Sequence, residues 1–236
     1  MRAHECECVL FDLDGCLYPA GNGLEEHCRQ RIYSFMTDVL GVEDVPLAQA
    51  LWHTAFRRYN QSLRALRACG YKFDADQYWR YIREGSGAFL APAPDTAGLL
   101  QHLRAVGIRC WVVTNCREHE ALEALAQLGI PLELFDGVLG ADFMGDSCKP
   151  EHAAFAKVIA HTGCNPHRTV MFEDSLRNLV TAKALGIRCV LVGDTTVTEE
   201  ATDPALAAAD GVVDARITHC TLAHVQASAM SAALGL

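Results

Sequence analysis

Three short apolar runs in this 236-residue sequence each end abruptly in polar or acidic side chains. The runs are residues 8–11, 108–113 and 169–172, and the groups after them are Asp12 and Asp14, Thr114 and Asn115, and Glu173 and Asp174. Such apolar runs are typical of parallel strands that are buried on both faces. The carboxyl ends of parallel strands meet at one edge of an open α/β sheet, so we expect these polar groups to gather there.

The pair Asp12 and Asp14 carries the strongest chemical signal. Side chains two residues apart on a strand point the same way. Two like charges at the mouth of a buried strand are costly unless a cation lies between them. A divalent metal and a phosphate ester would make this placement useful. For the pair taken alone, a strand that simply ends in a polar turn is an equally good interpretation.

Apolar runs and helical patterns alternate through the second part of the chain. We expect strands at 7–13, 108–114, 137–140, 169–173, 187–192 and 211–213, and helices at 94–106, 117–128, 150–162, 176–185 and 220–234. Residues 194–209 are expected to form a loop and a short helix. Alternation of this kind predicts a parallel sheet with helices on both faces.

A long segment without a parallel-strand signal follows the first strand. Helical patterns cover 24–40, 46–69 and 74–84. Asp74 is the expected N-cap of the last of these, with Gln77 three residues on. The predicted fold class is therefore α/β: a doubly wound, Rossmann-like parallel sheet, residues 1–17 and 91–236, with a helical cap domain, residues 18–90, inserted after the first strand.

Composition narrows the class of protein. A formal net charge of −9 argues against a nucleic-acid partner, because phosphate backbones need clustered Lys and Arg. The 11 cysteines are scattered without a Cys-x-x-Cys pair, which favours a reducing, cytoplasmic environment. The first residues lack the apolar stretch of a signal peptide, and no apolar run reaches membrane-spanning length, so no membrane partner is expected.

Four motifs in chain order resemble the haloacid dehalogenase-like hydrolase superfamily: Asp12-x-Asp14, Thr114, Lys149 before Pro150, and Glu173-Asp174. A proline there is expected to open a helix. Further features are similar to the pyrimidine 5'-nucleotidase branch of that superfamily, namely Cys16-Leu17-Tyr18, Thr114-Asn115, Asn178, and the stretch around Arg64 and Gly70-Tyr71.

The resemblance implies a phosphomonoesterase that works through an aspartyl-phosphate. Asp12 would be the nucleophile and Asp14 the general acid and base. Lys149 would neutralise the phosphoryl group and Asp12 in the transition state. The hydroxyl of Thr114 and the backbone amide of Asn115 would bind the phosphoryl oxygens.

The resemblance also implies Mg2+ as cofactor. Its expected ligands are Asp12, the backbone carbonyl of Asp14, and Asp174, because Mg2+ prefers oxygen ligands and retained waters. Glu173 would act through a metal-bound water. Ser175 and Asn178 are expected to cap the next helix and brace Asp174.

The branch resemblance implies a small phosphorylated substrate, a pyrimidine nucleoside 5'-monophosphate. Alternatives are a phosphatase for another small metabolite such as a sugar phosphate or flavin mononucleotide, a phosphomutase, and a non-catalytic binding protein. Tyr18, Tyr59, Arg64 and Trp52 are candidate substrate contacts, the last three on one predicted helix. Packing or solvent exposure is the simpler explanation for each of them.

Overall fold

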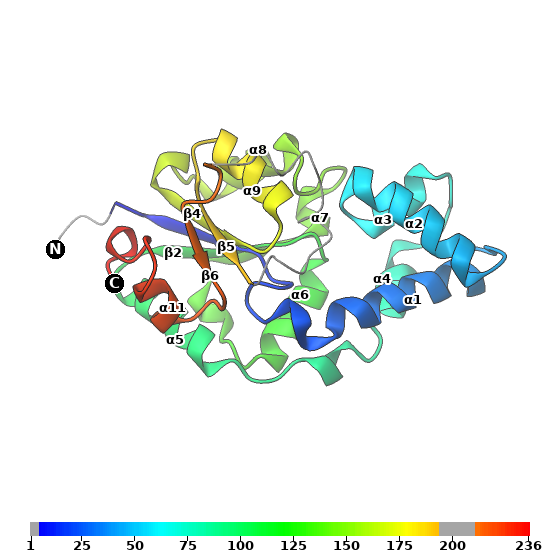
Figure 1. The fold of residues 1–236 in the computed structure, drawn as a ribbon, viewed down its shortest axis with the longest axis horizontal. Helices are drawn as coiled ribbons and strands as arrows, with labels where there is room; N and C mark the ends of the chain where they lie inside the picture. Colours follow the sequence, from blue (N-terminus) through cyan, green and yellow to red (C-terminus); the bar gives the residue numbers. More distant parts are fainter. Residues whose placement is uncertain (1–4, 194–210) are drawn as a thin grey trace. The chain divides into compact units, whose positions relative to one another are not determined.

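A computed structural model describes residues 5–193 and 211–236 of the chain (Figure 1). The chain forms two compact units. The core unit comprises Met1–Ala20 and Ala91–Leu236, and the helical unit comprises Gly21–Leu90. The helical unit begins at residue 21, whereas the sequence placed the start of the insert at residue 18.

The core unit is built on one six-stranded sheet in which every neighbouring pair is parallel. The strands are β1 (Cys8–Phe11), β2 (Arg109–Val113), β3 (Gly137–Leu139), β4 (Thr169–Glu173), β5 (Arg188–Val192) and β6 (Ala215–Ile217). Their order is β3-β2-β1-β4-β5-β6, so the direction of winding reverses between β1 and β4. Open α/β sheets bind ligands at the carboxyl ends of the strands beside such a reversal.

Helices cover both faces of this sheet (Figure 1). They are α5 (Pro94–Ala105), α6 (Glu118–Gln127), α7 (Ala141–Met144), α8 (His152–Thr162), α9 (Leu176–Ala184) and α11 (Leu222–Gln226). Helices α8 and α9 lie on one face, and α5 and α11 on the other. Strands β1 and β4 are buried along their whole length, which explains their unbroken apolar composition. The predicted doubly wound α/β fold is confirmed.

The helical unit contains α1 (Leu24–Asp38), α2 (Val45–Tyr59), α3 (Ser62–Ala68) and α4 (Ala75–Arg83). Its interior is aromatic, with Phe35 and Tyr78 in edge-to-face contact at a ring distance of 5.2 Å. The Asp74 side chain accepts a hydrogen bond from the Gln77 backbone N–H at 2.7 Å, which confirms Asp74 as the N-cap of α4.

The single predicted helix at 46–69 is wrong, because the structure has two helices there. Asn60 has φ 50° and ends α2 in the left-handed region, which asparagine tolerates better than most residues. The chain then restarts at Ser62 as α3. Tyr59 and Arg64 consequently lie on different helices.

Three other boundaries differ from the prediction. Helix α8 begins at His152 rather than Pro150, since residues 148–151 form a turn in which the Glu151 N–H donates to the Cys148 carbonyl. The last strand is Ala215–Ile217, not 211–213. The expected helix 220–234 is interrupted after α11, where the Ser228 hydroxyl bonds to the Val225 carbonyl and competes with the helical pattern. The predicted loop and helix at 194–209 lie outside the described residues.

A membrane-spanning helix needs about 20 mostly apolar residues. Among the helices that the structure describes, none combines sufficient length with sufficient hydropathy to cross a membrane.

Candidate active site

The register of the two central strands places Asp12 beside Glu173. Phe11 pairs with Phe172, and the Asp12 backbone N–H donates to the Phe172 carbonyl at 2.9 Å. Glu173 is the last residue of β4, and Asp12 directly follows β1. The parallel pairing therefore brings two acids from distant parts of the sequence to the same level of the same sheet edge.

Lys149 lies between these two acids. Its Nζ is 2.8 Å from Asp12 Oδ1 and 2.8 Å from Glu173 Oε2. The lysine side chain is only 2% exposed, so this is a buried ion triad rather than a surface pair. Burial lowers the pKa of the Lys149 ammonium, but the charges of Asp12 and Glu173 outweigh burial and leave that pKa above its ordinary value.

Asp174 completes a cluster of three carboxylates. One oxygen each from Asp12, Glu173 and Asp174 lie within 4.8 Å of one another. The Asp174 carboxylate rests against the backbone of Gly15, where an added Cβ would be 2.2 Å from Asp174 Oδ2. Gly15 also has φ 75°, in the left-handed region that favours glycine. Both the space and the conformation require glycine at this position.

The electrostatics of the cluster fit a divalent cation. Burial and then the negative charge of Glu173 raise the pKa of Asp12 well above its ordinary value. The same causes in the same order, with Asp12 added, raise the pKa of Asp174. Burial would also raise the pKa of Glu173, but the Lys149 ammonium and the hydrogen bonds to Asp12, Lys149 and Asp174 together outweigh burial and lower that pKa. The Lys149 ammonium thus stands against three clustered carboxylates. A divalent cation that binds oxygen ligands, placed beside Asp12 and Asp174, would balance the remaining negative charge.

Thr114 and Asn115 follow β2 at the same edge. The Thr114 hydroxyl is 3.2 Å from the Cys116 backbone N–H, from which it accepts a hydrogen bond. The Asn115 carboxamide makes two bonds to the backbone of Lys149: its Nδ2 donates to the Lys149 carbonyl at 2.9 Å, and its Oδ1 accepts from the Lys149 N–H at 2.9 Å. Sequence reasoning offered only the backbone amide of Asn115 and missed this role of its side chain.

Asp14 and Tyr18 are joined by a hydrogen bond, in which the Tyr18 hydroxyl donates to Asp14 Oδ1. Both belong to the core unit, and Tyr18 is buried. The predicted substrate contact Tyr18 thus bonds to the predicted general acid.

The remaining substrate candidates lie in the helical unit. Tyr59 ends α2, and the Arg64 guanidinium on α3 is 6.0 Å from the centre of its ring. Trp52 is buried, stacks on Phe56 and donates from Nε1 to the Ser62 hydroxyl at 2.9 Å, so its role is packing. Tyr59 and Arg64 stay predictions.

Two further predicted residues follow β4. The backbone N–H of Ser175 donates to Glu173 Oε1 at 3.1 Å, which fixes the second oxygen of that carboxylate. Ser175 is the N-cap residue of α9 without a capping bond from its side chain, contrary to expectation. Asn178 is buried in the first turn of α9.

Glu118 is a bracing residue that the sequence did not reveal. Its carboxylate accepts hydrogen bonds from the backbone N–H groups of Gly140, Asp142 and Phe143 at 2.7–3.1 Å. These bonds fix the loop after β3 to the start of α6, next to the Thr114 turn. No short motif signals a contact between residues so far apart in sequence.

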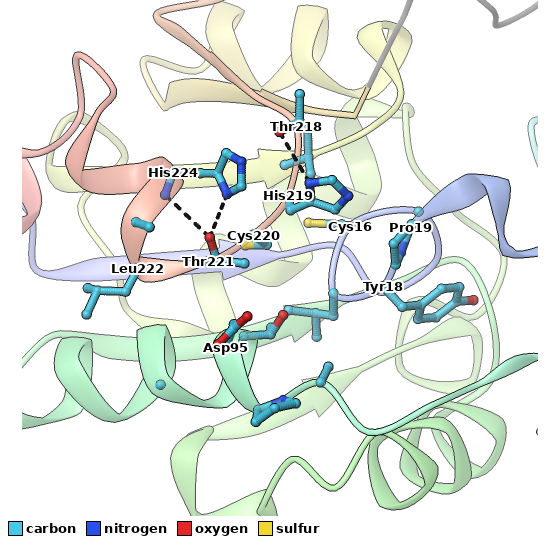
Figure 2. A pocket seen from close by; sticks show the side chains of 18 of the residues that line it. Cys16, Tyr18, Pro19, Asp95, Thr218, His219, Cys220, Thr221, Leu222 and His224 are labelled. Atoms are coloured by element: carbon cyan, nitrogen blue, oxygen red, sulfur yellow. Dashed lines mark hydrogen bonds between the residues drawn. The ribbon is translucent and has the colours of Figure 1, made fainter.

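A cavity of about 690 Å3 lies beside this cluster in the core unit (Figure 2). Its walls are the loop Gly15–Pro19, residues 92–96 and 98, Val192, and residues 218–224 and 226. Asp12, Lys149 and Glu173 are not among the described residues that line it. Gly15 lines the cavity and also lies against the Asp174 carboxylate.

Curated relatives share substantial parts of the sequence. A phosphoglycolate phosphatase of Neisseria meningitidis serogroup A is 34% identical over 118 residues, which is 50% of this chain and 48% of that protein. The chain thus spans about half the length of that relative. A phosphoglycolate phosphatase of Chromobacterium violaceum is 25% identical over 208 residues, covering 82% of this chain and 87% of that protein.

The fold also has a counterpart among solved structures. The crystal structure of a haloacid dehalogenase-type phosphatase from Thermococcus onnurineus superposes with a TM-score of 0.63 at 22% identity, covering 94% of this chain and 96% of that one. The model of the haloacid dehalogenase-like hydrolase family matches residues 6–186, a range that contains every predicted core motif from Asp12 to Asp174. The chain belongs to the haloacid dehalogenase-like hydrolase family.

Proposed function

We propose that this chain is a Mg2+-dependent phosphomonoesterase that acts on a small phosphorylated metabolite through an aspartyl-phosphate. The observation that carries the proposal is the buried ammonium of Lys149 at 2.8 Å from Asp12 Oδ1, beside the carboxylate of Asp174. A carboxylate held in this way is oriented to attack phosphorus. The same ammonium would stabilise the negative charge that the phosphoryl oxygens carry in the transition state.

The reaction has two steps. In the first, an Asp12 oxygen bonds to phosphorus, the ester P–O bond breaks, and Asp14 gives its proton to the departing alkoxide. In the second, Asp14 takes a proton from water, the water oxygen bonds to phosphorus, and the P–O bond to Asp12 breaks. The products are the alcohol and inorganic phosphate, and both aspartates return to their starting state.

The metal would be held by Asp12, Asp174 and the backbone carbonyl of Asp14, with Glu173 reaching it through water. When bound, Mg2+ would add positive charge against the phosphoryl oxygens and the crowded carboxylates. Glu173 would have a second role as well, because one of its oxygens contacts Lys149 and the other accepts a hydrogen bond from the Ser175 N–H. Glu173 would thereby keep the ammonium directed at Asp12.

The phosphoryl oxygens would be bound at the end of β2. The hydroxyl of Thr114 and the backbone N–H of Asn115 lie at the start of the turn that leads into α6. Backbone N–H groups at such a strand-to-helix turn bind anions well. The Asn115 side chain would meanwhile hold Lys149 in place through its two backbone bonds.

The relatives support a small metabolite other than a nucleotide. Both relatives described above are named phosphoglycolate phosphatases. They favour the alternative drawn from the sequence, a small phosphorylated metabolite, over the pyrimidine nucleoside monophosphate. We therefore rank a short phosphorylated acid such as 2-phosphoglycolate as the first substrate to test.

The test is phosphate release from a panel of monoesters with Mg2+ or with EDTA. The panel contains 2-phosphoglycolate, glyceraldehyde 3-phosphate, sugar phosphates, flavin mononucleotide, UMP and CMP. We expect Mg2+-dependent turnover of a small non-nucleotide ester that disappears in Asp12→Asn and persists in Asp76→Asn, which changes an exposed aspartate of the helical unit.

Two other outcomes would contradict the substrate class or the nucleophile, respectively. Preference for UMP or CMP would restore the nucleotidase assignment while keeping the mechanism. Full activity in Asp12→Asn would exclude Asp12 as the nucleophile.

A further inference from the structure

The turn that follows β1 brings Tyr18 back to Asp14. The backbone N–H groups of Cys16 and Leu17 both donate to the Leu13 carbonyl, at 3.2 and 3.0 Å. Gly15 supplies the left-handed residue of this turn. Residues four apart in a turn of this kind lie on the same side, and the Tyr18 hydroxyl donates to Asp14 Oδ1 across it.

The chemistry of this bond suits a group that must hand over a proton. A phenol is protonated at neutral pH and donates one hydrogen bond, and an ionised carboxylate only accepts. The bond engages Oδ1 of Asp14 and fixes the rotation of the carboxylate. In the proposed role, Oδ2 would exchange the proton with the departing alkoxide or with water.

Tyr18 lies in a buried part of the chain. Its side chain is buried, and its neighbour Leu17 is 1% exposed. In the view of Figure 2, the Tyr18 ring points away from His219 and His224. A ring fixed in this way can position a neighbour more accurately than a surface side chain could.

We propose that Tyr18 is a positioning residue that holds the Asp14 carboxylate in the orientation needed to protonate the leaving group. This inference rests on the proposed phosphomonoesterase function and replaces the expectation that Tyr18 contacts the substrate. Tyr18 touches no reacting atom in this role, and it acts only through Asp14.

The test compares esters whose leaving groups differ in how much they need protonation by a general acid. An alkoxide leaves poorly without a proton, whereas 4-nitrophenolate is a stable anion and leaves without one. The value of kcat/KM reports the steps up to departure of the alcohol, so it isolates the first half of the reaction from the later hydrolysis of the aspartyl-phosphate. The measurement is the ratio of kcat/KM for the best alkyl ester of the panel to kcat/KM for p-nitrophenyl phosphate.

In Tyr18→Phe, we expect this ratio to fall by about 10-fold or more, since general acid catalysis contributes about 100-fold to 10,000-fold in total. The ratio is measured in one preparation, so it does not depend on the fraction of correctly folded protein. Asp14→Asn should lower the ratio further, and adding Tyr18→Phe to Asp14→Asn should change it little, because the two residues act as a unit.

The matched control is Tyr81→Phe. The Tyr81 hydroxyl donates to Asp38 Oδ2 at 2.8 Å within the helical unit, so this variant removes the same kind of phenol–carboxylate bond from another place. The ester ratio of Tyr81→Phe should equal that of the wild type.

Two results would overturn the inference and can be told apart. If the wild type is active and Tyr18→Phe lowers kcat/KM equally for both esters, or for neither, the positioning role is wrong and the phosphatase function stands. A wild type that hydrolyses no monoester, alkyl or aryl, would remove the proposed function and the role of Tyr18 with it.

Discussion

At the scale of single residues, the positions of the charged groups in the site depend on contacts with uncharged residues. Gly15 has no side chain, and the Asn115 carboxamide takes no direct part in the proposed reaction. Yet Gly15 gives Asp174 its place, and Asn115 fixes the backbone of Lys149. Both therefore act on the reaction through the charged group that they position.

Gly15→Ala should remove most of the activity. The new Cβ would lie 2.2 Å from Asp174 Oδ2 and 2.8 Å from its Cγ, so the carboxylate must move away from its place in the cluster. We expect weaker Mg2+ affinity in calorimetric titration and a matching loss of kcat/KM. The left-handed φ adds about 1 kcal/mol of strain to the folded state.

The control for this prediction is Gly107→Ala. Gly107 has φ 84°, and no described atom lies within 4 Å of a Cβ built there. It should show the backbone strain in its unfolding free energy and keep normal Mg2+ affinity. Equal Mg2+ affinity in the two variants would contradict the proposed contact with Asp174.

Asn115→Ala should slow catalysis and destabilise the protein. Two hydrogen bonds to the Lys149 backbone are lost, which corresponds to about 1–3 kcal/mol in the free energy of unfolding. Freed from this clamp, Lys149 should stabilise the transition state less well, and we expect kcat to fall by about 10-fold with a smaller change in KM.

Asn165→Ala separates the two effects. Asn165 accepts a hydrogen bond from the His167 N–H at the amino end of β4, away from the site. Its loss should lower stability without lowering kcat. If urea unfolding and kinetics showed the same pattern in both variants, the clamp would have no specific role in catalysis.

At the scale of strands and helices, the two edge strands of the sheet begin with the same pattern of hydrogen bonds from an aspartate. The Asp136 N–H donates to the Cys110 carbonyl at 2.7 Å, and its carboxylate accepts from the Cys110 N–H at 2.8 Å. Asp214 makes the same pair of bonds with Cys189, both at 2.8 Å. Each aspartate directly precedes an edge strand, β3 or β6, and ties its start to the next strand inward.

A basic side chain completes each of these ties. Arg104, near the end of α5, contacts Asp136 at 2.7 Å, and Lys183, near the end of α9, contacts Asp214 at 2.6 Å. Each aspartate therefore joins an edge strand to its neighbour and to the helix that leads into that neighbour. The arrangement fixes where both edge strands begin.

Asp136→Ala and Asp214→Ala should each lower the free energy of unfolding by about 2 kcal/mol, the usual value of a hydrogen bond to a charged group. The double variant should show the sum, because the two sites lie on opposite edges of a six-stranded sheet. Asp142→Ala, which loses an exposed ion pair with Arg117, should cost less than about 1 kcal/mol. Urea unfolding monitored by circular dichroism measures all four.

The bonds of Asp214 also show why some elements could be predicted from the sequence and others could not. Buried strands such as β1 and β4 are apolar throughout, so their pattern is visible in the sequence alone. The last strand was misplaced at 211–213 because its start depends on the bond between Asp214 and Cys189, residues far apart in the sequence. The break at Asn60 was missed for a similar reason, since an asparagine within a helical pattern is compatible with either outcome.

Some residues of the candidate site could likewise be predicted from the sequence, and others could not. Asp12, Lys149 and Asp174 could be named from their place at the ends of apolar runs or before a proline. The bonds of Tyr18, Asn115 and Glu118 could not, because each depends on the geometry of a turn or on a contact between separate loops. Position along a strand is encoded locally, whereas the partners of a loop side chain are set by the assembled fold.

At the scale of the whole molecule, the proposed chemistry belongs to the core unit. Asp12, Asp14, Lys149 and Asp174 all lie there, while Tyr59 and Arg64 lie in the helical unit. The roles of Tyr59 and Arg64 stay predictions from the sequence. The expected metal ligands Asp12, Asp14 and Asp174 all belong to the core unit.

The carboxylate cluster makes the stability of the metal-free protein depend on pH. Asp12 and Asp174 have pKa values raised by burial in the folded state, so they bind more protons when folded than when unfolded. Their contribution to stability is present at low pH and is lost as pH rises through the folded pKa values. Glu173 has a lowered pKa and the opposite sign, but its effect is complete by about pH 5.5, above its unfolded value.

Mg2+ should reverse this loss, because it binds the ionised carboxylates of the folded state. At about 100 times its Kd, a bound ligand stabilises by about 2.7 kcal/mol, or roughly 5–10 °C in Tm for a chain of this size. We therefore expect the Tm measured in EDTA to fall as the pH rises above the range in which an ordinary carboxyl group titrates, and the Tm increase produced by Mg2+ to grow in the same direction. Differential scanning calorimetry at several pH values, with and without Mg2+, measures both.

Asp174→Asn provides the decisive comparison, because it removes one raised carboxyl and one expected metal ligand together. In EDTA, this variant should be more stable than the wild type at a pH high enough to ionise Asp174 in the folded wild type, since an amide carries no charge to bury. It should gain little from Mg2+ at any pH. A Tm increase with Mg2+ that is independent of pH in the wild type, or that survives in Asp174→Asn, would mean that the cation binds somewhere other than the cluster of Asp12, Glu173 and Asp174.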